Sequence, residues 1–352
     1  MSIRPRIREL AAYDFAPHPE GVKLDQNELP YDLPELLRQE LLARIAALPL
    51  NRYPDLDASE LRAALARLHD WPADGIVVTP GSNVLIQNLV IAAGIGQTVL
   101  LPTPTFSVYR MQASILGAEL VEVPSGPAFR LPVADLLREM EGRRGLLFVA
   151  NPAAPTGNLH DSDDLERLAD AAGDRWLVVI DEAYGQFAGS DSSQLARRPG
   201  VLSLRTLSKA FGLAGARVGY ALTSPQLAGE LRKVVLPFVV SGLQQAAALT
   251  MIEHNAEVEE RARQVALERA WLQRSLNDVA GVHVFPSTTN FVLFRVDDGR
   301  SVYEGLLGKG VVVRPQSGPG LENCLRVTAG TREENERFLE ALRATLVEVE
   351  HA

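Results

Sequence analysis

The chain alternates between short runs of apolar residues and longer stretches with helical periodicity. The apolar runs lie at 75–79, 99–101, 120–123, 145–150, 176–180 and 201–204, and helical patterns lie between them at 83–94, 105–116, 133–141 and 162–173. Runs that are apolar on both faces and separated by helices are typical of a parallel sheet covered on each side. The pattern therefore predicts a large α/β block in which most strands run parallel.

The pattern changes towards the C-terminus. A long charged helical stretch at about 243–278 precedes shorter apolar strands at 282–285, 290–294 and 324–327, and a last helix is expected at about 332–349. Strands and helices in this proportion predict a smaller α+β domain. The first 30 residues are rich in proline and indicate an extended arm. We predict an arm at 1–30, a large domain at 48–230, and a small domain formed by 31–47 and 231–352.

Composition excludes several classes of protein. Of 352 residues, 46% are apolar, which fits a globular chain, and the net charge of −9 argues against a nucleic-acid partner. Cys324 is the single cysteine, so neither an intrachain disulfide nor a zinc cluster of thiolates can form. The six histidines lack metal-ligand spacing, and we expect no metal. No apolar run is long enough for a membrane helix or a secretory signal, so we expect a cytoplasmic protein without membrane contact.

Polar groups follow four of the predicted strands, and ligands bind at the carboxyl ends of strands in open parallel sheets. The four segments begin with Gly81-Ser82-Asn83, Asn151-Pro152, Asp181-Glu182-Ala183-Tyr184 and Arg205-Thr206-Leu207-Ser208-Lys209. Gly81 and Ser82 open a helix and could form an anion cradle, or Ser82 could simply cap that helix. Asp181 could face a cationic ring nitrogen, cap a helix, or pair with an arginine. Lys209 could form a Schiff base if its pKa is lowered, or lie at the surface.

These segments together resemble the fold-type-I, pyridoxal-phosphate-dependent aminotransferases of class I/II, and most closely their histidinol-phosphate branch. The resemblance covers nearly the whole chain. It rests on Asn27-Glu28-Leu29-Pro30, Arg52-Tyr53-Pro54-Asp55, Gly81-Ser82, Pro104-Thr105-Phe106, the segment 151–157, Asp181-Glu182-Ala183-Tyr184, the segment 205–220 and the segment 325–331. It implies a large domain with a mostly parallel central sheet flanked by helices, and a smaller α+β domain.

The resemblance also implies a role for each site residue. Lys209 would bind pyridoxal 5'-phosphate covalently and move a proton, Asp181 would pair with the pyridinium nitrogen, and Asn151 and Tyr184 would hydrogen-bond the ring 3-oxygen. Phe106 would stack on the ring. The cofactor phosphate would be held by Gly81, Ser82, Asn83, Thr206, Ser208 and Arg217, and by Tyr53 from the other subunit of a homodimer. Arg326 would bind the substrate anion, assisted by Arg314, Tyr13 and Asn151, and the N-terminal arm would close over the site.

The reaction implied is transamination of L-histidinol phosphate with 2-oxoglutarate, which gives imidazole acetol phosphate and L-glutamate in histidine biosynthesis. An aromatic amino-acid aminotransferase or a phospho-amino-acid decarboxylase of the same fold remains an alternative. Outside this fold, a lysine Schiff-base enzyme without a cofactor would need no partner like Asp181, and a non-catalytic binding protein would not need Lys209. Phe106, Leu29 and Ala153-Ala154 depart from the family pattern, and these departures leave the choice of substrate open.

Overall fold

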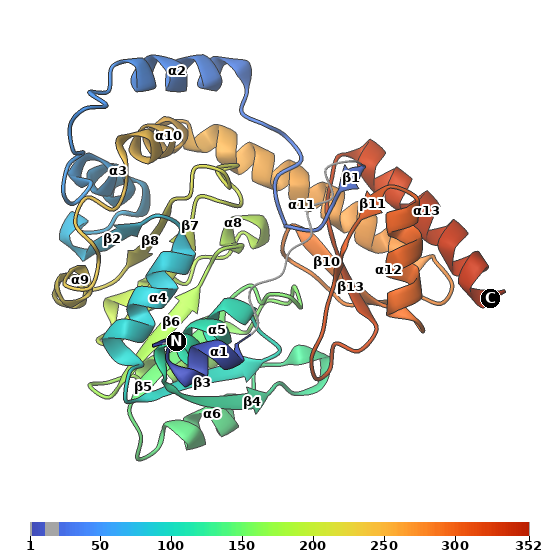
Figure 1. Cartoon of the computed structure of the whole chain (residues 1–352), viewed down its shortest axis with the longest axis horizontal. Coiled ribbons are helices and arrows are strands. Elements are labelled where there is room, and N and C mark those ends of the chain that lie inside the picture. Colours follow the sequence, from blue (N-terminus) through green and yellow to red (C-terminus); the bar gives the residue numbers. More distant parts are fainter. Residues whose placement is uncertain (1, 11–20, 352) are drawn as a thin grey trace.

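A seven-stranded sheet forms the centre of the larger part of the molecule, which a computed structural model describes over residues 2–10 and 21–351 (Figure 1). The strand order is β2-β8-β7-β6-β5-β3-β4. The strands are β2 (Ile76–Thr79), β3 (Thr98–Thr103), β4 (Glu119–Pro124), β5 (Gly145–Ala150), β6 (Trp176–Asp181), β7 (Val201–Thr206) and β8 (Gly219–Leu222). Only β8 runs antiparallel to its neighbours β2 and β7. The predicted mostly parallel sheet is therefore confirmed.

Helices cover both faces of this sheet. Successive residues of a strand point to opposite faces, and both faces carry apolar side chains that pack against helices. Leu146 and Phe148 of β5 pack in a cluster with α4 (Ser82–Ala93), α5 (Ser107–Leu116) and α9 (Pro225–Arg232). Leu147 and Val149 of the same strand pack in another with α6 (Val133–Met140) and α7 (Ser162–Asp170). The sheet is thus buried between two helical layers, which explains the continuous apolar runs in the sequence.

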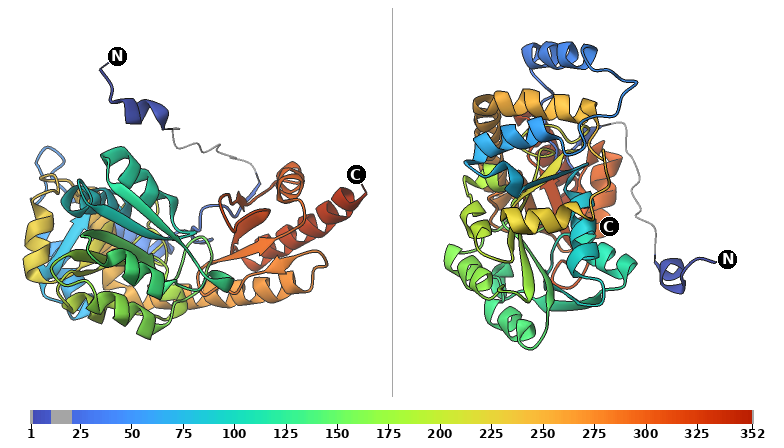
Figure 2. Two further views of the ribbon diagram at one scale, coloured as in Figure 1. Left: turned by 90° about the horizontal axis from the view of Figure 1, so that it is seen from below. Right: turned by 90° about the vertical axis from the view of Figure 1, so that its left-hand side faces the viewer.

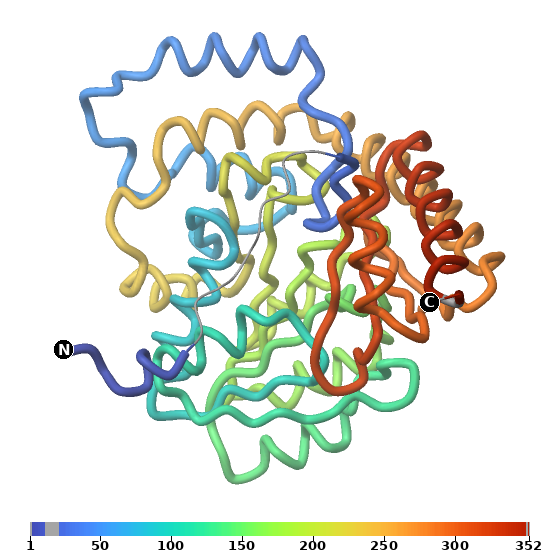
Figure 3. Tube along the Cα trace, turned by 45° about the vertical axis from the view of Figure 1, so that its right-hand side comes forward, coloured from blue at the N-terminus to red at the C-terminus, as the bar shows by residue number. Residues whose placement is uncertain are grey.

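The C-terminal part contains a second, antiparallel sheet in the order β12-β13-β10-β9. Its strands are β9 (His283–Val284), β10 (Phe291–Arg295), β12 (Arg314–Pro315) and β13 (Cys324–Thr328), and it packs with α11 (Asn255–Asn277), α12 (Gly299–Gly308) and α13 (Arg332–Glu350). The long α11 runs from the large sheet to the small one (Figure 2). Beside the small sheet, β1 (Val22–Lys23) pairs in parallel with β11 (Val311–Val312), so residues near the N-terminus lie against the C-terminal part (Figure 3).

Buried residues form separate clusters in the two parts. Leu37 of α2 (Glu35–Ala46) shares a cluster with α3 (Ser59–His69) and α10 (Gly242–Glu253), beside the large sheet. The cluster of the small sheet takes in Leu272 and Leu276 of α11 and also Val22 and Leu24. The domain boundaries expected from the sequence stay a prediction.

Three of the differences between the structure and the sequence expectations have a clear physical reason. β8 was not predicted, because its four residues follow a long irregular segment. The single helix expected at 243–278 is two helices, since His254 between α10 and α11 leaves the helical conformation. In the arm, α1 (Pro5–Glu9) is a short helix rather than extended chain, and proline near its start favours that geometry.

The remaining elements are short. They are α8 (Gly185–Ala188) and the single 3₁₀ turns η1 (Ala73–Gly75), η2 (Pro127–Phe129) and η3 (Ser193–Arg197). Within the described residues, no helix combines the length and the apolar character needed to cross a bilayer. Nor do three or more His, Cys, Asp or Glu side chains of the described chain gather in a way that could hold a metal ion.

Candidate active site

Neighbouring strands bring the predicted polar segments to one edge of the large sheet. The Asn151 N–H after β5 donates to the Asp181 carbonyl at 2.8 Å, and the Glu182 N–H after β6 donates to the Leu204 carbonyl of β7 at 2.9 Å. Three of the four segments are therefore held in register by the backbone hydrogen bonds of adjacent parallel strands. The first segment, at the end of β2, reaches the same edge because β2 is parallel to the other strands across β8.

Lys209 lies three residues after the end of β7 and points into this edge. Its Nζ donates to the Gln26 carbonyl at 2.9 Å and lies 5.7 Å from the centre of the Tyr184 ring. Burial, and then the charge of Arg326, lower the pKa of the Lys209 amine to about 7. A large share of this amine is therefore uncharged near neutral pH, which is the state in which a lysine acts as a nucleophile.

Asp181 is the last residue of β6, and its side chain is buried. Its carboxylate accepts hydrogen bonds from the Tyr109 hydroxyl at 2.6 Å and from the Ala183 N–H at 3.0 Å. Burial nevertheless raises the pKa of this carboxyl to about 6. Tyr109 is held in turn by stacking on Phe148 at 4.4 Å and by edge contact with Phe106 at 5.5 Å. A cationic ligand group beside Asp181 would compensate for the cost of burying its charge.

The adjacent acid, Glu182, belongs to a separate buried network. Its carboxylate accepts hydrogen bonds from Ser203 Oγ at 2.5 Å and from the Arg205 guanidinium at 2.8 Å, and Arg205 also contacts Asp191 at 2.6 Å. Arg205 thus neutralises Glu182, while Asp181 faces away from it toward Tyr109. The two adjacent acids therefore lie in different environments. Among the residues described, Asp181 has no arginine partner.

Tyr184 and Asn151 are buried and fixed by their neighbours. The Tyr184 hydroxyl accepts from Asn27 Nδ2 at 2.7 Å, and its ring makes an edge contact with Phe291 at 5.2 Å. Asn151 Oδ1 accepts from the His160 N–H at 2.8 Å, which leaves the Nδ2 group to face a ligand. Both side chains can therefore donate to an oxygen bound in front of them.

An anion cradle forms where α4 begins. Gly81 has φ +84°, and a Cβ there would lie 2.6 Å from Arg217 Nη2, so the absence of a side chain lets the guanidinium approach the helix start. Arg217 also donates to Ser208 Oγ at 3.2 Å, and the Ser208 N–H donates to Thr206 Oγ1 at 3.1 Å. The first turn of α4 has neither a side-chain cap nor an acidic residue, so its N–H groups suit an anion.

The other predicted site residues differ in how much of their surface is exposed. Ser82 is half-buried and Asn83 exposed on the first turn of α4, and Phe106 is half-buried at the start of α5. Tyr53 has 82% of its surface exposed and stacks on Phe238 at 4.9 Å. Tyr13 lies outside the described residues.

Arg326 of the small sheet lies beside this site, and Arg314 is its neighbour on the next strand. Arg314 and Arg326 are direct partners across β12 and β13, and Arg326 donates to the Asp25 carbonyl at 2.8 Å. The Arg326 guanidinium also lies 5.2 Å from the centre of the Phe291 ring, on whose edge Tyr184 packs. Like charges directly opposite each other on a sheet are unfavourable, and an anionic ligand between them would offset this repulsion.

These groups fit the parts of the cofactor expected from the sequence. The uncharged amine of Lys209 suits an aldehyde, and the buried carboxylate of Asp181 suits a protonated ring nitrogen. Tyr184 and Asn151 suit a ring oxygen, and the cradle beside Gly81 suits a phosphate. A side chain at Gly81 would meet the Arg217 guanidinium, which would have to shift to make room.

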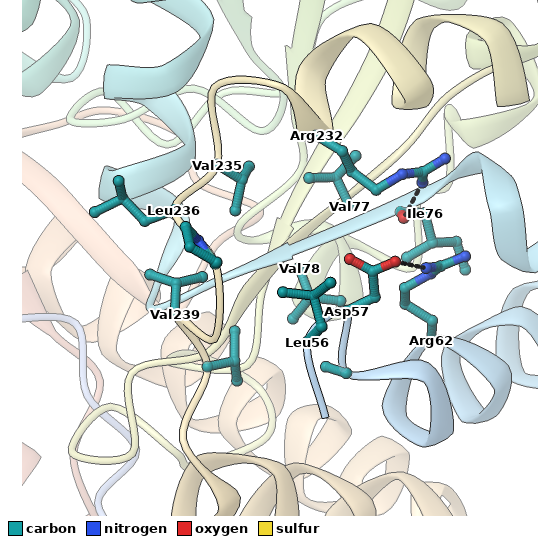
Figure 4. A pocket seen from close by; sticks show the side chains of 13 residues that line it. Leu56, Asp57, Arg62, Ile76, Val77, Val78, Arg232, Val235, Leu236 and Val239 are labelled. Carbon is teal, nitrogen blue, oxygen red and sulfur yellow. Dashed lines mark hydrogen bonds and ion pairs between the residues drawn. The ribbon is translucent and has the colours of Figure 1, made fainter. Parts of the chain in front are cut away.

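A separate cavity of about 180 Å³ lies away from these residues (Figure 4). Its walls are mostly apolar, from Val77 and Val78 of β2 and from Leu236 and Val239, with Arg62 and Arg232 at one side. The figure shows both arginines already engaged, Arg62 with Asp57 and Arg232 with the Ile76 carbonyl. None of the predicted site residues lines this cavity, and its chemistry does not suit the expected reaction.

Sequence reasoning missed several residues that shape the site. Tyr109 contacts Asp181, His160 fixes Asn151, and Gln26 and Asn27 contact Lys209 and Tyr184. For Tyr109 a signal exists, because it lies three residues after Phe106 and so shares its side of the helix start. Asn27 is part of a quoted motif, but its partner lies 157 residues away in the sequence, and no local pattern reveals that contact.

Comparisons with known proteins show the family to which the chain belongs. The sequence model of the family "Aminotransferase class I and II" matches residues 19–342. The chain belongs to this family. It is 46% identical over 347 residues to the histidinol-phosphate aminotransferase of Deinococcus radiodurans, covering 97% of this chain and 96% of that protein. It is 42% identical to the enzyme of that name from Methylibium petroleiphilum, covering 98% of this chain and 94% of that protein.

A solved structure of the family matches the whole fold of this aminotransferase. The histidinol-phosphate aminotransferase of Sinorhizobium meliloti, crystallised with pyridoxal-5'-phosphate, superposes with a TM-score of 0.89 at 25% identity. The match covers 99% of this aminotransferase and 98% of that chain. The two sheets and their connections are therefore those of a known aminotransferase.

Proposed function

We propose that the protein is a pyridoxal-phosphate-dependent histidinol-phosphate aminotransferase, which converts L-histidinol phosphate and 2-oxoglutarate into imidazole acetol phosphate and L-glutamate. The observation that carries this conclusion is the 46% identity to a histidinol-phosphate aminotransferase over 97% of the chain. The site agrees with it, because an amine with a lowered pKa, a buried carboxylate and an anion cradle lie at one sheet edge. This function belongs to histidine biosynthesis.

Lys209 and Asp181 would act directly on the cofactor. When bound, pyridoxal 5'-phosphate supplies an aldehyde that condenses with amines and a protonated ring that withdraws electrons from the reacting carbon. Lys209 would hold the aldehyde carbon and, once its Nζ is released, would take the proton from the substrate Cα. Its lowered pKa suits both tasks, since each needs an uncharged amine. Asp181 would keep the ring nitrogen protonated.

The remaining side chains would orient the bound groups. Gly81, Ser82, Asn83, Thr206, Ser208 and Arg217 would hold the cofactor phosphate, and Phe106 would cover the ring. Tyr184 and Asn151 would donate to the ring oxygen. Arg326, with Arg314 as its cross-strand partner, would bind the phosphate of the amino donor and then the distal carboxylate of 2-oxoglutarate, because a guanidinium fork fits either anion. Asn151 and Tyr13 complete the expected substrate contacts.

A homodimer is part of this proposal. Large apolar side chains are exposed in two segments of sequence, Leu36, Leu42, Leu50, Tyr53 and Leu56 in the first and Leu236, Phe238 and Leu243 in the second. The stacking of Tyr53 on Phe238 brings the two segments together. In α2 only Leu37 is buried, and the helix lies at the margin of the molecule across α10 (Figure 1). A second copy covering this region would bury these side chains and bring Tyr53 to the partner's cofactor phosphate. The cytoplasmic location stays a prediction.

The reaction is tested with the purified protein and three amino donors, histidinol phosphate, phenylalanine and tyrosine, each with 2-oxoglutarate. We expect glutamate to form with the highest kcat/KM from histidinol phosphate. A higher kcat/KM for tyrosine would favour the aromatic alternative, and release of carbon dioxide from a phosphorylated amino acid would favour the decarboxylase.

The covalent site is tested separately. Borohydride should bleach the yellow protein and fix the cofactor on the peptide that contains Lys209, as read by mass spectrometry. Lys209→Ala should fold, remain unlabelled and lack transamination. A labelled peptide elsewhere in the chain would remove Lys209 from its proposed role.

A further inference from the structure

The Asn27 side chain is one of the most thoroughly fixed polar groups in the site. Only 1% of the residue is exposed, and its backbone has φ 54°, in the left-handed region that asparagine tolerates better than most residues. Its N–H donates to Thr328 Oγ1 at 2.9 Å, and its carbonyl accepts from Asn290 Nδ2 at 3.0 Å. The segment therefore presents the Asn27 amide to the site in a single orientation.

The two ends of this amide have different partners. Oδ1 accepts from Thr328 Oγ1 at 3.3 Å, whereas Nδ2 donates to the Tyr184 hydroxyl at 2.7 Å. A phenol has one proton to donate and two lone pairs to accept with. Since Asn27 already supplies the proton of the shared hydrogen bond, the proton of Tyr184 must point to another acceptor, and the site interior is where a ligand oxygen would lie.

We propose that Asn27 is a positioning residue that fixes the direction of the Tyr184 proton, so that Tyr184 acts as a hydrogen-bond donor toward the ring oxygen of the cofactor. This inference rests on the proposed function. Nothing in the reaction itself requires Asn27, which touches neither the amine of Lys209 nor Asp181. The effect of its side-chain donor on the cofactor passes through Tyr184.

An acceptor in place of the amide donor gives the sharpest test. Asn27→Asp keeps the shape, tolerates the backbone conformation and still accepts from Thr328, but its carboxylate would take the Tyr184 proton for itself. The ring oxygen would then lose a donor and hold the proton of the neighbouring Lys209–cofactor linkage more tightly. Because the lost hydrogen bond was made to a charged group, the pKa of that linkage should rise by about one to two pH units.

The measurement is a pH titration of the visible absorbance of the holoenzyme, which reports this linkage without turnover. Asn27→Asp also adds a negative charge near Lys209, whose other charged neighbours, Arg326, Glu28, Arg217 and Lys23, are the same in every variant. The control is therefore the same substitution in a Tyr184→Phe background, which has no phenol proton. We expect Asn27→Asp to raise the pKa of the linkage in the wild-type background and to change it little in the Tyr184→Phe background.

The outcomes separate this inference from the proposed function. An unchanged pKa in Asn27→Asp, or an equal rise in both backgrounds, overturns the role of Asn27, since in the second case the charge acts directly. If the wild type develops no visible band with pyridoxal phosphate, the proposed function fails and this inference fails with it. Should Asn27→Asp not fold, Asn27→Gly replaces it in the test, because it removes the donor and glycine accepts this backbone conformation. We expect Asn27→Gly to raise the pKa of the linkage by less than Asn27→Asp would. A pKa equal to that of the wild type overturns the proposal.

Discussion

The hydroxyl of Tyr109 donates to the carboxylate of Asp181 at 2.6 Å, and both side chains are buried. This hydrogen bond lowers the pKa of Asp181, whereas burial, which is the larger effect, raises it to about 6. Tyr109 thus helps to keep an acid ionised in a place that disfavours its charge. The stacking of Tyr109 on Phe148 holds the donor in place without using its hydroxyl.

Removal of this hydroxyl should shift the acid side of the activity profile. Tyr109→Phe keeps the stacked ring but takes one donor from Asp181, so the pKa of Asp181 should rise further. A carboxylate that protonates at higher pH loses activity at higher pH, and we expect the acid limb of kcat/KM to move up by about one pH unit. Rate measurements between pH 5 and 9 check this shift. An identical profile would mean that Tyr109 only fills space.

Asp181→Asn should lower the activity and raise the stability of the folded protein. We expect kcat to fall by about 10²-fold or more, since each loss of ~1.4 kcal/mol of transition-state stabilisation is tenfold in rate. The folded state should become more stable at neutral pH. In the wild type the pKa of the Asp181 carboxyl is about 6 in the folded protein and 3.8 in the unfolded chain, so the folded protein holds this proton to a higher pH. Wild-type stability therefore falls as pH rises through that window, by about 3 kcal/mol or less, and the asparagine variant avoids this loss.

Urea unfolding of the cofactor-free proteins at pH 4 and pH 8 measures the difference. The stability of the asparagine variant relative to wild type should be greater at pH 8 than at pH 4. A relative stability that does not change with pH would show that the carboxyl of Asp181 is not strained by burial.

Arg326→Ala should weaken both substrates together. If one guanidinium binds the phosphate of the amino donor and the carboxylate of the oxo acid, both KM values should rise about tenfold or more, as expected for the loss of a charged hydrogen bond. Initial rates with each substrate varied in turn give the two values. Arg314→Ala is the matched comparison on the neighbouring strand. A rise confined to one substrate would assign the two anions to different residues.

Gly81→Ala should weaken cofactor binding. The added Cβ would lie 2.6 Å from Arg217 Nη2, so the guanidinium would have to shift from its position in the cradle. We expect the affinity for pyridoxal phosphate to fall about tenfold, which corresponds to ~1.4 kcal/mol. Gly96→Ala is the control, because that glycine has a similar φ of +71° and open space around it. Fluorescence titration of both variants shows whether an alanine at positive φ lowers the affinity only when it is placed beside Arg217. Equal affinities would contradict the cradle.

The sequence predicted the parts of the molecule in which a local pattern carries the information. The apolar runs of β5, β6 and β7 are buried on both faces, so each appears without interruption in the sequence, and the polar residues that follow them meet at one edge because parallel strands end together. Lys209 and Asp181 became candidate site residues in this way. The short β8 has no such signal, and its place between β2 and β7 depends on tertiary pairing.

Contacts between distant segments could not be predicted from periodicity. Asn27 meets Tyr184 across 157 residues and Arg205 meets Glu182 across 23. An arginine was one of the partners that the sequence allowed for Asp181. In the structure the neighbouring Arg205 pairs with Glu182 instead. Such choices are decided by which face of a strand each side chain occupies and by what packs there.

The pairing of β1 with β11 has a mechanical consequence. Residues 22–24 are hydrogen-bonded to Gly310 and Val312, at and just before β11, and to Thr328 of β13 in the small sheet. Two residues further along, the carbonyl of Gln26 accepts a hydrogen bond from the amine of Lys209. If the small sheet rotates when a substrate enters, this strand must travel with it and carry that carbonyl relative to the lysine. Binding of an anion at Arg326 would then change the position of the Gln26 carbonyl relative to the Lys209 amine.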